Sequence, residues 1–124
     1  KARESLDMVE MIFGENYLDD HCCVGVSTNP ISPLKYAPET LDTIIEYARR
    51  RQPVFILPCA MSGVSAPMDL FGSIVQQNAE AVAGITLTQL IQPGTPAAYC
   101  PASTMADSPV ASPKRYCHHQ DSRV

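Results

Sequence analysis

The sequence predicts an α/β protein of about three units, in each of which a strand is followed by a helix. Short apolar runs with the length of strands alternate with helical patterns of ten or more residues, and prolines or turn residues bound the runs. Such alternation is typical of parallel βα units. Hydrophobic residues make up 45% of the 124 residues, which favours one folded domain over disorder.

Composition argues against several classes of partner. The formal net charge is −4 and the pI is about 5.2. The only basic run, at residues 49–51, fits a helix end, so we expect no nucleic acid partner. No apolar stretch reaches the roughly 18 residues of a membrane span, and the start does not resemble a signal peptide. Five scattered cysteines favour a reducing compartment, so we expect a soluble, cytoplasmic protein without membrane association.

The first element expected is a helix over residues 2–13. Its apolar face combines Leu6, Val9, Ile12 and Phe13 at the three-and-four spacing of a helix. Gly14 ends the helix, and residues 16–20 are expected to form a polar connection. Residues 21–27 then predict a strand, which opens into a proline-stiffened loop at 28–33.

The clearest helix is predicted over residues 38–51. Pro38 suits its first turn, acidic residues lie near its start, and three arginines lie near its end. Its buried stripe should be Leu41, Ile44, Ile45 and Ala48. Residues 53–58 form a continuous apolar run between prolines, which predicts a strand covered on both faces. A loop is expected at residues 59–66.

A long helix is expected at residues 67–91. Its apolar positions, which we expect to be buried, are Phe71, Ile74, Val75, Val82, Ile85 and Leu90. The small residues between them, two glycines included, indicate that its backbone packs closely against a neighbour. Residues 95–99 predict a weak third strand, followed by a loop at 100–107. No Leu, Ile or Phe occurs after Ile91.

The common enzyme motifs are absent: there is no glycine-rich phosphate loop, no Gly-x-Ser-x-Gly elbow and no His-Glu-x-x-His. Attention therefore falls on the three loops that follow the strands, because such loops build the active sites of parallel α/β folds. These loops, residues 27–33, 59–63 and 99–104, are rich in small hydroxyl residues and nearly free of charge. That lining suits an uncharged or cationic small ligand, although ordinary turn formation would explain it equally well.

Residues 57–67, 75–80 and 84–99 resemble the trimethylamine methyltransferase (MttB) superfamily, and residues 29–34 fit the loop that precedes them in that family. The resemblance covers residues 1–107. It implies that these residues are an internal fragment, about a quarter of a longer chain that folds as a (β/α)₈ TIM barrel, a fold that normally needs roughly 200 residues or more. The domain assignment is therefore a partial barrel at residues 1–107.

The resemblance implies corrinoid-dependent methyl transfer. A methylated tertiary or quaternary amine, of the trimethylamine or betaine type, would lose a methyl group to the Co(I) corrinoid of a separate carrier protein. This chain would bind no corrinoid itself, and we expect an oligomer in the full-length parent. Positioning and exclusion of water should matter more than acid–base chemistry. The true trimethylamine enzymes of the family carry a pyrrolysine in a later region, which these residues do not reach.

Candidate substrate-binding residues come from the three strand-end loops. They are Asn29, Met61, Ser62, Gly63, Tyr99, Ser103 and Thr104. Tyr99 offers the aromatic face expected beside a cation. The sequence identifies no catalytic residue and no metal ligand set.

Residues 108–124 depart from the family pattern, and we expect an irregular, disordered tail there. A frameshift, a truncated gene or a fragmentary record would each produce this. Two classes of function stay open: a corrinoid-protein methyltransferase that is intact only in a longer parent, and an inactive remnant with no catalysis of its own. Isolated, the segment should aggregate, because its edge strands would be unpaired.

Three polar clusters have plainer explanations than chemistry. Cys117, His118 and His119 fit a solvated tail better than a metal site, since adjacent histidines rarely bind one ion. The Cys22–Cys23 pair lies at a strand start, where side chains serve stability. The polar run Gln76, Gln77, Asn78 and Glu80 predicts an exposed helix face or a contact with missing chain.

Overall fold

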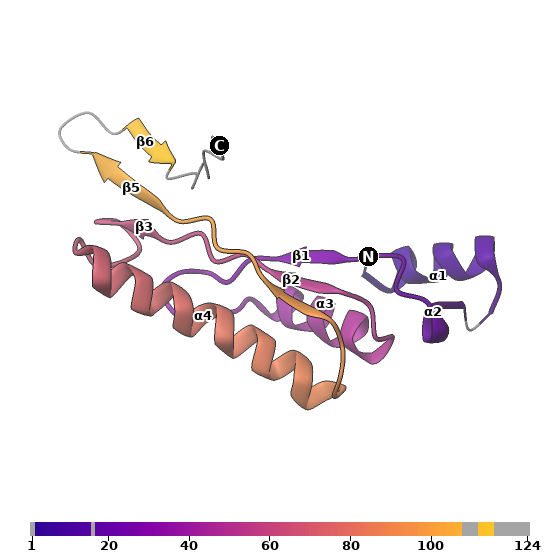
Figure 1. Ribbon diagram of the computed structural model, residues 1–124. Helices are drawn as coiled ribbons and strands as arrows, with labels where there is room; N and C mark the ends of the chain where they lie inside the picture. Colours follow the sequence, from indigo (N-terminus) through magenta and orange to yellow (C-terminus); the bar gives the residue numbers. More distant parts are fainter. Residues whose placement is uncertain (1, 16, 108–111, 116–124) are drawn as a thin grey trace, which may run out of the picture.

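The computed structural model describes residues 2–15, 17–107 and 112–115. The elements in chain order are α1 (Ala2–Phe13), α2 (Tyr17–Asp20), β1 (Val26–Thr28), α3 (Pro38–Arg49), β2 (Val54–Ile56), β3 (Met61–Ser62), α4 (Leu70–Ile91), β4 (Ala97–Tyr99), β5 (Thr104–Asp107) and β6 (Ser112–Arg115). Strands β1, β2 and β4 form a parallel sheet in that order (Figure 1). The predicted α/β class and the parallel βα units are confirmed.

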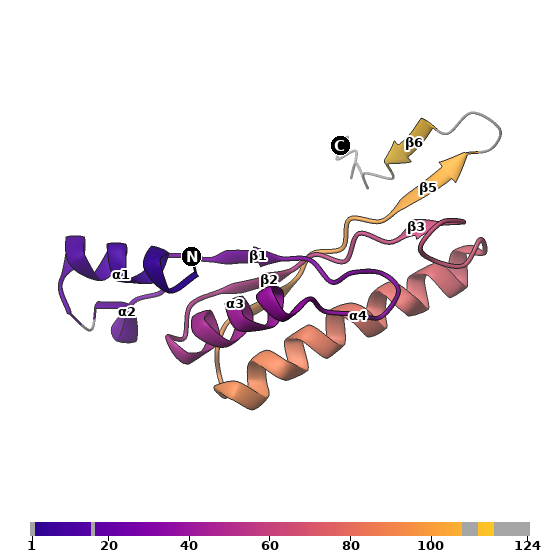
Figure 2. The same cartoon turned by 180° about the vertical axis from the view of Figure 1, so that it is seen from behind.

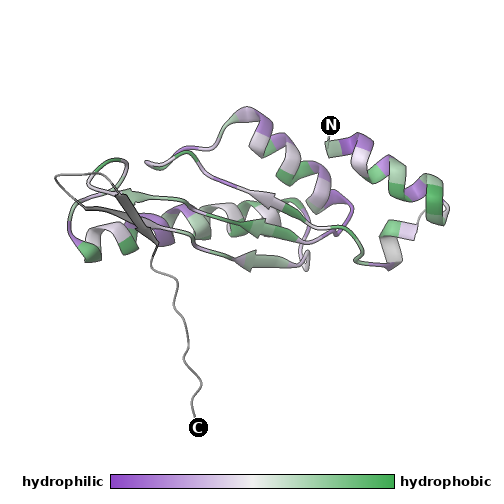
Figure 3. Ribbon diagram, turned by 90° about the horizontal axis from the view of Figure 1, so that it is seen from above, coloured by the Kyte–Doolittle hydropathy of each residue, from purple (hydrophilic) through white to green (hydrophobic). Residues whose placement is uncertain are grey.

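One face of this sheet is covered by helices and the other is open. Along residues 52–60 every second residue is buried, and the residues between them are exposed or half-buried. In β2, Val54 and Ile56 are fully buried beneath α3 and α4, whereas Phe55 is 39% exposed. Figure 3 looks onto the open face. The expectation that this strand is covered on both sides is therefore wrong for the described residues, because both crossover helices pack on one side.

Past the ends of β2 and β4 the sheet continues as a narrow two-stranded ribbon, made of residues 57–62 and 100–107. Backbone N–H groups of Cys100, Ala102 and Thr104 donate to the carbonyls of Ile56, Pro58 and Ala60. The pairing then resumes between β3 and β5, in the same register. Residues 61–62 and 104–107 were expected to be loops, and that expectation is wrong. Pro58 lacks an N–H donor, but its carbonyl still accepts a hydrogen bond from Ala102 on the neighbouring segment, so the proline does not end the pairing.

Helix α4 runs beneath both the sheet and the ribbon (Figures 1 and 2). Several large apolar residues of the helix are exposed, whereas Ile85, Leu87 and Ile91 are partly buried against the core. Its buried residues are the small or polar ones, namely Ser73, Glu80, Ala81, Gly84 and Thr88. The expected buried set is therefore mostly wrong, because Phe71, Ile74, Val75, Val82 and Leu90 are exposed. The predicted close packing of the helix backbone against a neighbour is confirmed at Gly84, which lies against the side chains of Ile56 and Tyr36.

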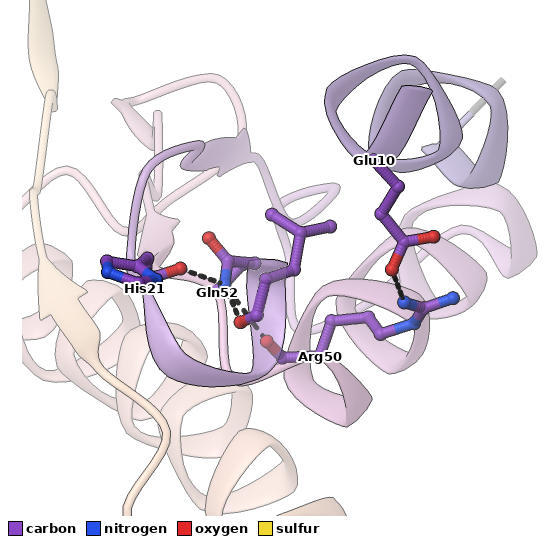
Figure 4. A network of polar contacts seen from close by, with 5 residues as sticks. Glu10, His21, Arg50 and Gln52 are labelled. Carbon is purple, nitrogen blue, oxygen red and sulfur yellow. Dashed lines mark hydrogen bonds and ion pairs between the residues drawn. The ribbon is translucent and has the colours of Figure 1, made fainter. Parts of the chain in front are cut away.

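A buried glutamine joins the N-terminal helices to the sheet. The side-chain amide of Gln52 donates to the carbonyls of Leu18, His21 and Arg50 (Figure 4). Its oxygen accepts from the N–H groups of Cys23 and Val24. These hydrogen bonds use backbone N–H and C=O groups of the residues before β1, which a strand would use for pairing. The strand consequently begins at Val26 rather than at residue 21.

The N-terminal helical region differs from expectation in two ways. Residues 17–20 form the short helix α2 instead of a polar connection, because Leu18 is buried in the core. In α1, Leu6 is buried, but Ile12 and Phe13 are 73% and 58% exposed. Ion pairs of Arg50 with Glu10 and of Arg3 with Glu46 join α1 to α3.

Helix α3 ends at Arg49 rather than at residue 51, because Arg51 adopts a left-handed conformation with φ of 53°. Its buried residues are Ile44, Tyr47 and Ala48.

After Asp107 the structure describes residues 112–115 alone. Residues 112–115 form β6, which pairs antiparallel with β5. The expectation of a wholly irregular tail is therefore wrong for these four residues. The cluster Cys117, His118 and His119 lies outside the described residues.

Candidate functional site

The candidate site lies where the parallel strands end. Asn29 follows β1 directly, and Met61 and Thr104 face each other across the ribbon. Asn29 is exposed, between the buried residues Thr28 and Pro30. It therefore lies on the open side of the sheet, because side chains alternate between the faces of a strand. By the same alternation Met61 and Thr104, both half-buried, belong to the open side.

The two candidate serines lie on the opposite side, against α4. The hydroxyl of Ser62 is 2.7 Å from that of Ser73, and Ser62 is 7% exposed. The hydroxyl of Ser103 donates to the side-chain oxygen of Gln77. Both hydroxyl groups thus bond the helix that supports the ribbon, and they are turned away from the open face.

Gly63 and Tyr99 have distinct positions. Gly63 has a φ of 83°, the left-handed region that favours glycine, in the tight turn after β3. Tyr99 shares its register row with Thr28 and Ile56, which are buried on the helix side. Its ring therefore leaves the sheet on the helix side, and it is 44% exposed because β4 is an edge of the three-stranded sheet.

The open face carries residues that sequence reasoning did not select. Phe55 lies at its centre, in register with Ser27 and Ala98 on the flanking strands. Cys59 is exposed between two buried residues and so also belongs to the open side. The available signal was alternation: Phe55, Leu57, Cys59 and Met61 form one side of a single extended run.

A hollow of about 410 Å³ adjoins Asn29 at the free edge of β1. It is lined by Ser27, Thr28, Asn29, Glu39, Thr40 and Thr43. Hydroxyl and amide groups dominate this lining, and Glu39 supplies its one carboxylate. A carboxylate beside uncharged hydrogen-bonding groups suits a small cationic ligand better than an anion.

Three side chains of α4 each bond a different strand-end segment. The amide of Gln76 donates to the carbonyl of Ser65 at 2.8 Å, after β3. Gln77 accepts from Ser103, after β4. Glu80 accepts from the hydroxyl of Ser32 at 2.8 Å, after β1. The expectation that this polar run is an exposed face or a contact with missing chain is therefore wrong for these three residues, whereas Asn78 is exposed as expected.

Tyr36 links the same loop to α4. Its hydroxyl donates to the backbone carbonyl of Glu80 at 2.7 Å. Burial, together with the nearby carboxylate of Glu80, raises the pKa of Tyr36 to about 12. The phenol is thus a neutral donor at any physiological pH.

The described residues contain no group of three or more His, Cys, Asp or Glu side chains that could hold a metal ion. The four cysteines among them, Cys22, Cys23, Cys59 and Cys100, are all free thiols. Among the helices in residues 2–15 and 17–107, none is long and apolar enough to cross a membrane.

Comparison with known sequences finds similarity to one family of enzymes. The family profile described as "Trimethylamine methyltransferase (MTTB)" matches residues 1–113. A proline betaine:corrinoid methyltransferase of Eubacterium limosum is 47% identical over 81 residues, which are 65% of this chain and 17% of that protein. A glycine betaine methyltransferase of Desulfitobacterium hafniense is 37% identical over 108 residues, 86% of this chain and 22% of that protein.

A trimethylamine methyltransferase of Methanosarcina acetivorans is 44% identical over 90 residues, 68% of this chain and 18% of that protein. This chain therefore spans about a fifth of the length of the curated relatives it matches.

Proposed function

Because this chain belongs to the trimethylamine methyltransferase family, we propose that its residues serve a corrinoid-dependent methyltransferase that acts on a tertiary or quaternary methylamine. Relatives named for proline betaine, glycine betaine and trimethylamine support this class of substrate. The observation that carries the proposal is the family match over residues 1–113, together with an uncharged open face at the ends of parallel strands.

We further propose that β1, β2 and β4 with their helices are part of a (β/α)₈ barrel, in which the open face of the sheet becomes the interior. The polypeptide that closes this barrel is called the complete enzyme below. Two features support the proposal. Strands β1 and β4 are the edges of a three-stranded parallel sheet, and α4 exposes large apolar residues. Large apolar residues on the side of a helix that faces away from its own sheet are typical of a helix covered by further parts of a larger protein.

The residues of the open face suit the binding of a methylated cation. The ring of Phe55 and the thioether of Met61 offer polarizable surface to N-methyl groups. The amide of Asn29 can orient a polar group of the same ligand, and Glu39 attracts its positive charge from the adjoining hollow. This uncharged lining fits a methyl group that must shed its water before transfer.

The Co(I) corrinoid, presented by its carrier protein, would supply the nucleophile that takes the methyl group. The C–N bond breaks, its electron pair stays on nitrogen, and a quaternary ammonium thereby leaves as a neutral amine without any proton transfer. The task of this chain is then to hold nitrogen, methyl carbon and the approach path in line. Positioning of this kind can lower the activation free energy by roughly 7–11 kcal/mol.

The residues that we propose to face substrate are Asn29, Met61 and Thr104, with Phe55 added from the structure. The other candidates would act indirectly. On the helix side, Ser62, Ser103 and Tyr99 would help α4 to support the ribbon, and Gly63 would shape the turn after β3. We propose the cytoplasm as the location, since the described cysteines are free thiols. We also propose that the complete enzyme is an oligomer.

The test supplies the complete enzyme with a carrier protein in the Co(I) state and, separately, trimethylamine, glycine betaine and proline betaine. Loss of the Co(I) absorbance with one of these amines, dependent on the enzyme, is the expected result. No methyl transfer from any of them would favour the inactive remnant instead.

A further inference from the structure

Glu80 is a carboxylate in the interior, 1% exposed, in the middle of α4. Its two oxygens accept hydrogen bonds from three neutral donors. The hydroxyl of Ser32 donates at 2.8 Å, the backbone N–H of Leu34 at 3.0 Å, and the amide of Gln76 at 3.1 Å. Two of these donors belong to the loop between β1 and α3, so the carboxylate fixes that loop to the helix.

The loop that Glu80 holds has an unusual backbone. Ile31 and Lys35 close it with two backbone hydrogen bonds of 2.7 and 3.0 Å. Leu34, between them, has a φ of 53°, a left-handed conformation that costs a residue with a branched side chain about 1 kcal/mol or more. The bond from the N–H of Leu34 to Glu80 offsets this cost, because it ends on a buried carboxylate.

The same loop begins with Asn29. The six residues from Asn29 to Leu34 thus join the open face of the sheet to the anchor at Ser32 and Leu34. Tyr36 adds a further contact, since its hydroxyl bonds the backbone of Glu80 itself. Only Pro30 and Ile31 separate Asn29 from the anchor residue Ser32, so the anchor restricts the position of Asn29 through a short length of chain.

We propose that Glu80 is a positioning residue of the substrate site: its carboxylate holds the loop between β1 and α3 so that Asn29 stays at the open face. This rests on the proposed function, which assigns Asn29 to the substrate. Glu80 does not touch substrate, because it lies on the helix side of the sheet. Its negative charge is not the essential property, since its partners are all neutral donors.

The distinction between charge and acceptor geometry makes the proposal testable. In Glu80→Gln the amide oxygen can keep the bonds from Leu34 and Gln76, while Ser32 turns to accept from the new NH₂ group. In Glu80→Ala all three bonds are lost. The conservative variant should therefore rescue what the alanine variant loses.

The experiment measures amine KM and kcat in the complete enzyme, and hydrogen exchange at the Leu34 amide, with the Val54 amide of β2 as an internal reference. We expect Glu80→Ala to raise KM about tenfold and to speed exchange at Leu34 about tenfold, with Val54 unchanged. Glu80→Gln should stay within about threefold of the parent in both. Glu46→Ala, which removes a surface carboxylate paired with Arg3, is the matched control and should change neither.

Faster exchange at Leu34 with an unchanged KM would overturn the positioning role and leave Glu80 as a structural anchor. Unchanged exchange would overturn the anchor as well. A parent enzyme without methyl transfer would refute the proposed function, and the positioning role with it, while the exchange data would still report on the loop. Should Glu80→Ala fail to fold, Ser32→Ala carries the test, with a smaller rise in KM expected and an unchanged KM contradicting the proposal.

Discussion

Gly84 of α4 lies directly against Ile56 of β2: a Cβ atom at position 84 would stand 3.1 Å from Cδ1 of Ile56. It would also stand 2.5 Å from the hydroxyl oxygen of Tyr36. Helix and sheet can approach this closely only because position 84 has no side chain. The close contact holds α4 beneath the ends of the strands, where its polar side chains bond three loops.

The first prediction follows from this contact. Gly84→Ala should gain about 1 kcal/mol of helix propensity and lose about 1–3 kcal/mol to overpacking. We expect a net loss of stability of about 1 kcal/mol, measured as a lower Tm of the complete enzyme. Ala83→Ser adds one heavy atom at the exposed neighbouring position and should change Tm much less. Equal Tm values for the two variants would contradict the packing account.

A second prediction concerns Gln52, which is fully buried and makes five hydrogen bonds to backbone groups. Gln52→Leu keeps the volume and leaves those groups without their partner. Because unsatisfied buried groups are costly, we expect destabilisation of about 3 kcal/mol, measured by urea unfolding of the complete enzyme. Asn78→Ala, at an exposed position of α4, serves as the control. A loss no greater than that of the control would show that the hydrogen bonds of Gln52 contribute little.

A third prediction separates the two faces of the ribbon. Asn29→Ala and Met61→Ala remove groups from the open face, so each should raise the KM for the amine. Ser103→Ala removes a contact with Gln77 on the helix side and should lower Tm with a smaller effect on KM. Steady-state kinetics and thermal unfolding of the three variants provide the comparison. A larger KM effect for the serine would mean that the substrate lies on the helix side.

The fourth prediction is a pH dependence. Burial and the carboxylate of Glu80 raise the pKa of Tyr36 from 10.0 to about 12. Unfolded Tyr36 therefore loses its proton near pH 10, while the folded form keeps its proton until about pH 12. Unfolding releases a proton within this window, so stability falls as the pH rises from 10 to 12 and is independent of this group below pH 10.

The measurement is the free energy of unfolding of the complete enzyme at pH 9 and pH 11, beside that of Tyr36→Phe. Phenylalanine cannot ionise, so the advantage of tyrosine over phenylalanine should shrink at the higher pH. An advantage that stays constant would show that the phenol titrates normally.

A fifth prediction concerns the outer side of α4. Phe71 and Val75 lie one turn apart and are 81% and 68% exposed. If other parts of a barrel cover them, Phe71→Glu with Val75→Glu should inactivate the complete enzyme, because two charges would be buried. The same pair of changes should make isolated residues 1–124 more soluble. Full activity of the doubly substituted enzyme would show that this side of α4 faces solvent.

The sequence predicts which residues form the main elements better than it predicts where they pack. Apolar periodicity predicts α3, and the long run of apolar and small residues predicts α4. Periodicity does not say which side of α4 faces the sheet. Large apolar residues were expected inside, but the close approach at Gly84 favours small and polar residues at the fully buried positions of α4, and most of the large ones are exposed or only partly buried.

The candidate site shows the same limit. Prolines and turn residues predict where the first strand ends, and Asn29 directly follows β1 in the structure. Prolines also concealed the ribbon, because Pro58 and Pro101 suggest loops although the carbonyl of Pro58 still accepts from Ala102. Contacts such as those of Glu80 with Ser32 join residues distant in sequence, and no local pattern encodes them.

The most direct test of the whole account is the behaviour of residues 1–124 expressed alone. Sedimentation velocity together with circular dichroism during urea titration would measure size and cooperativity on the same sample. We predict self-association and a broad, non-cooperative loss of signal, because the open face of the sheet and the outer side of α4 have no cover. A monomer that unfolds in one sharp transition would contradict the claim that these residues form one layer of a larger barrel.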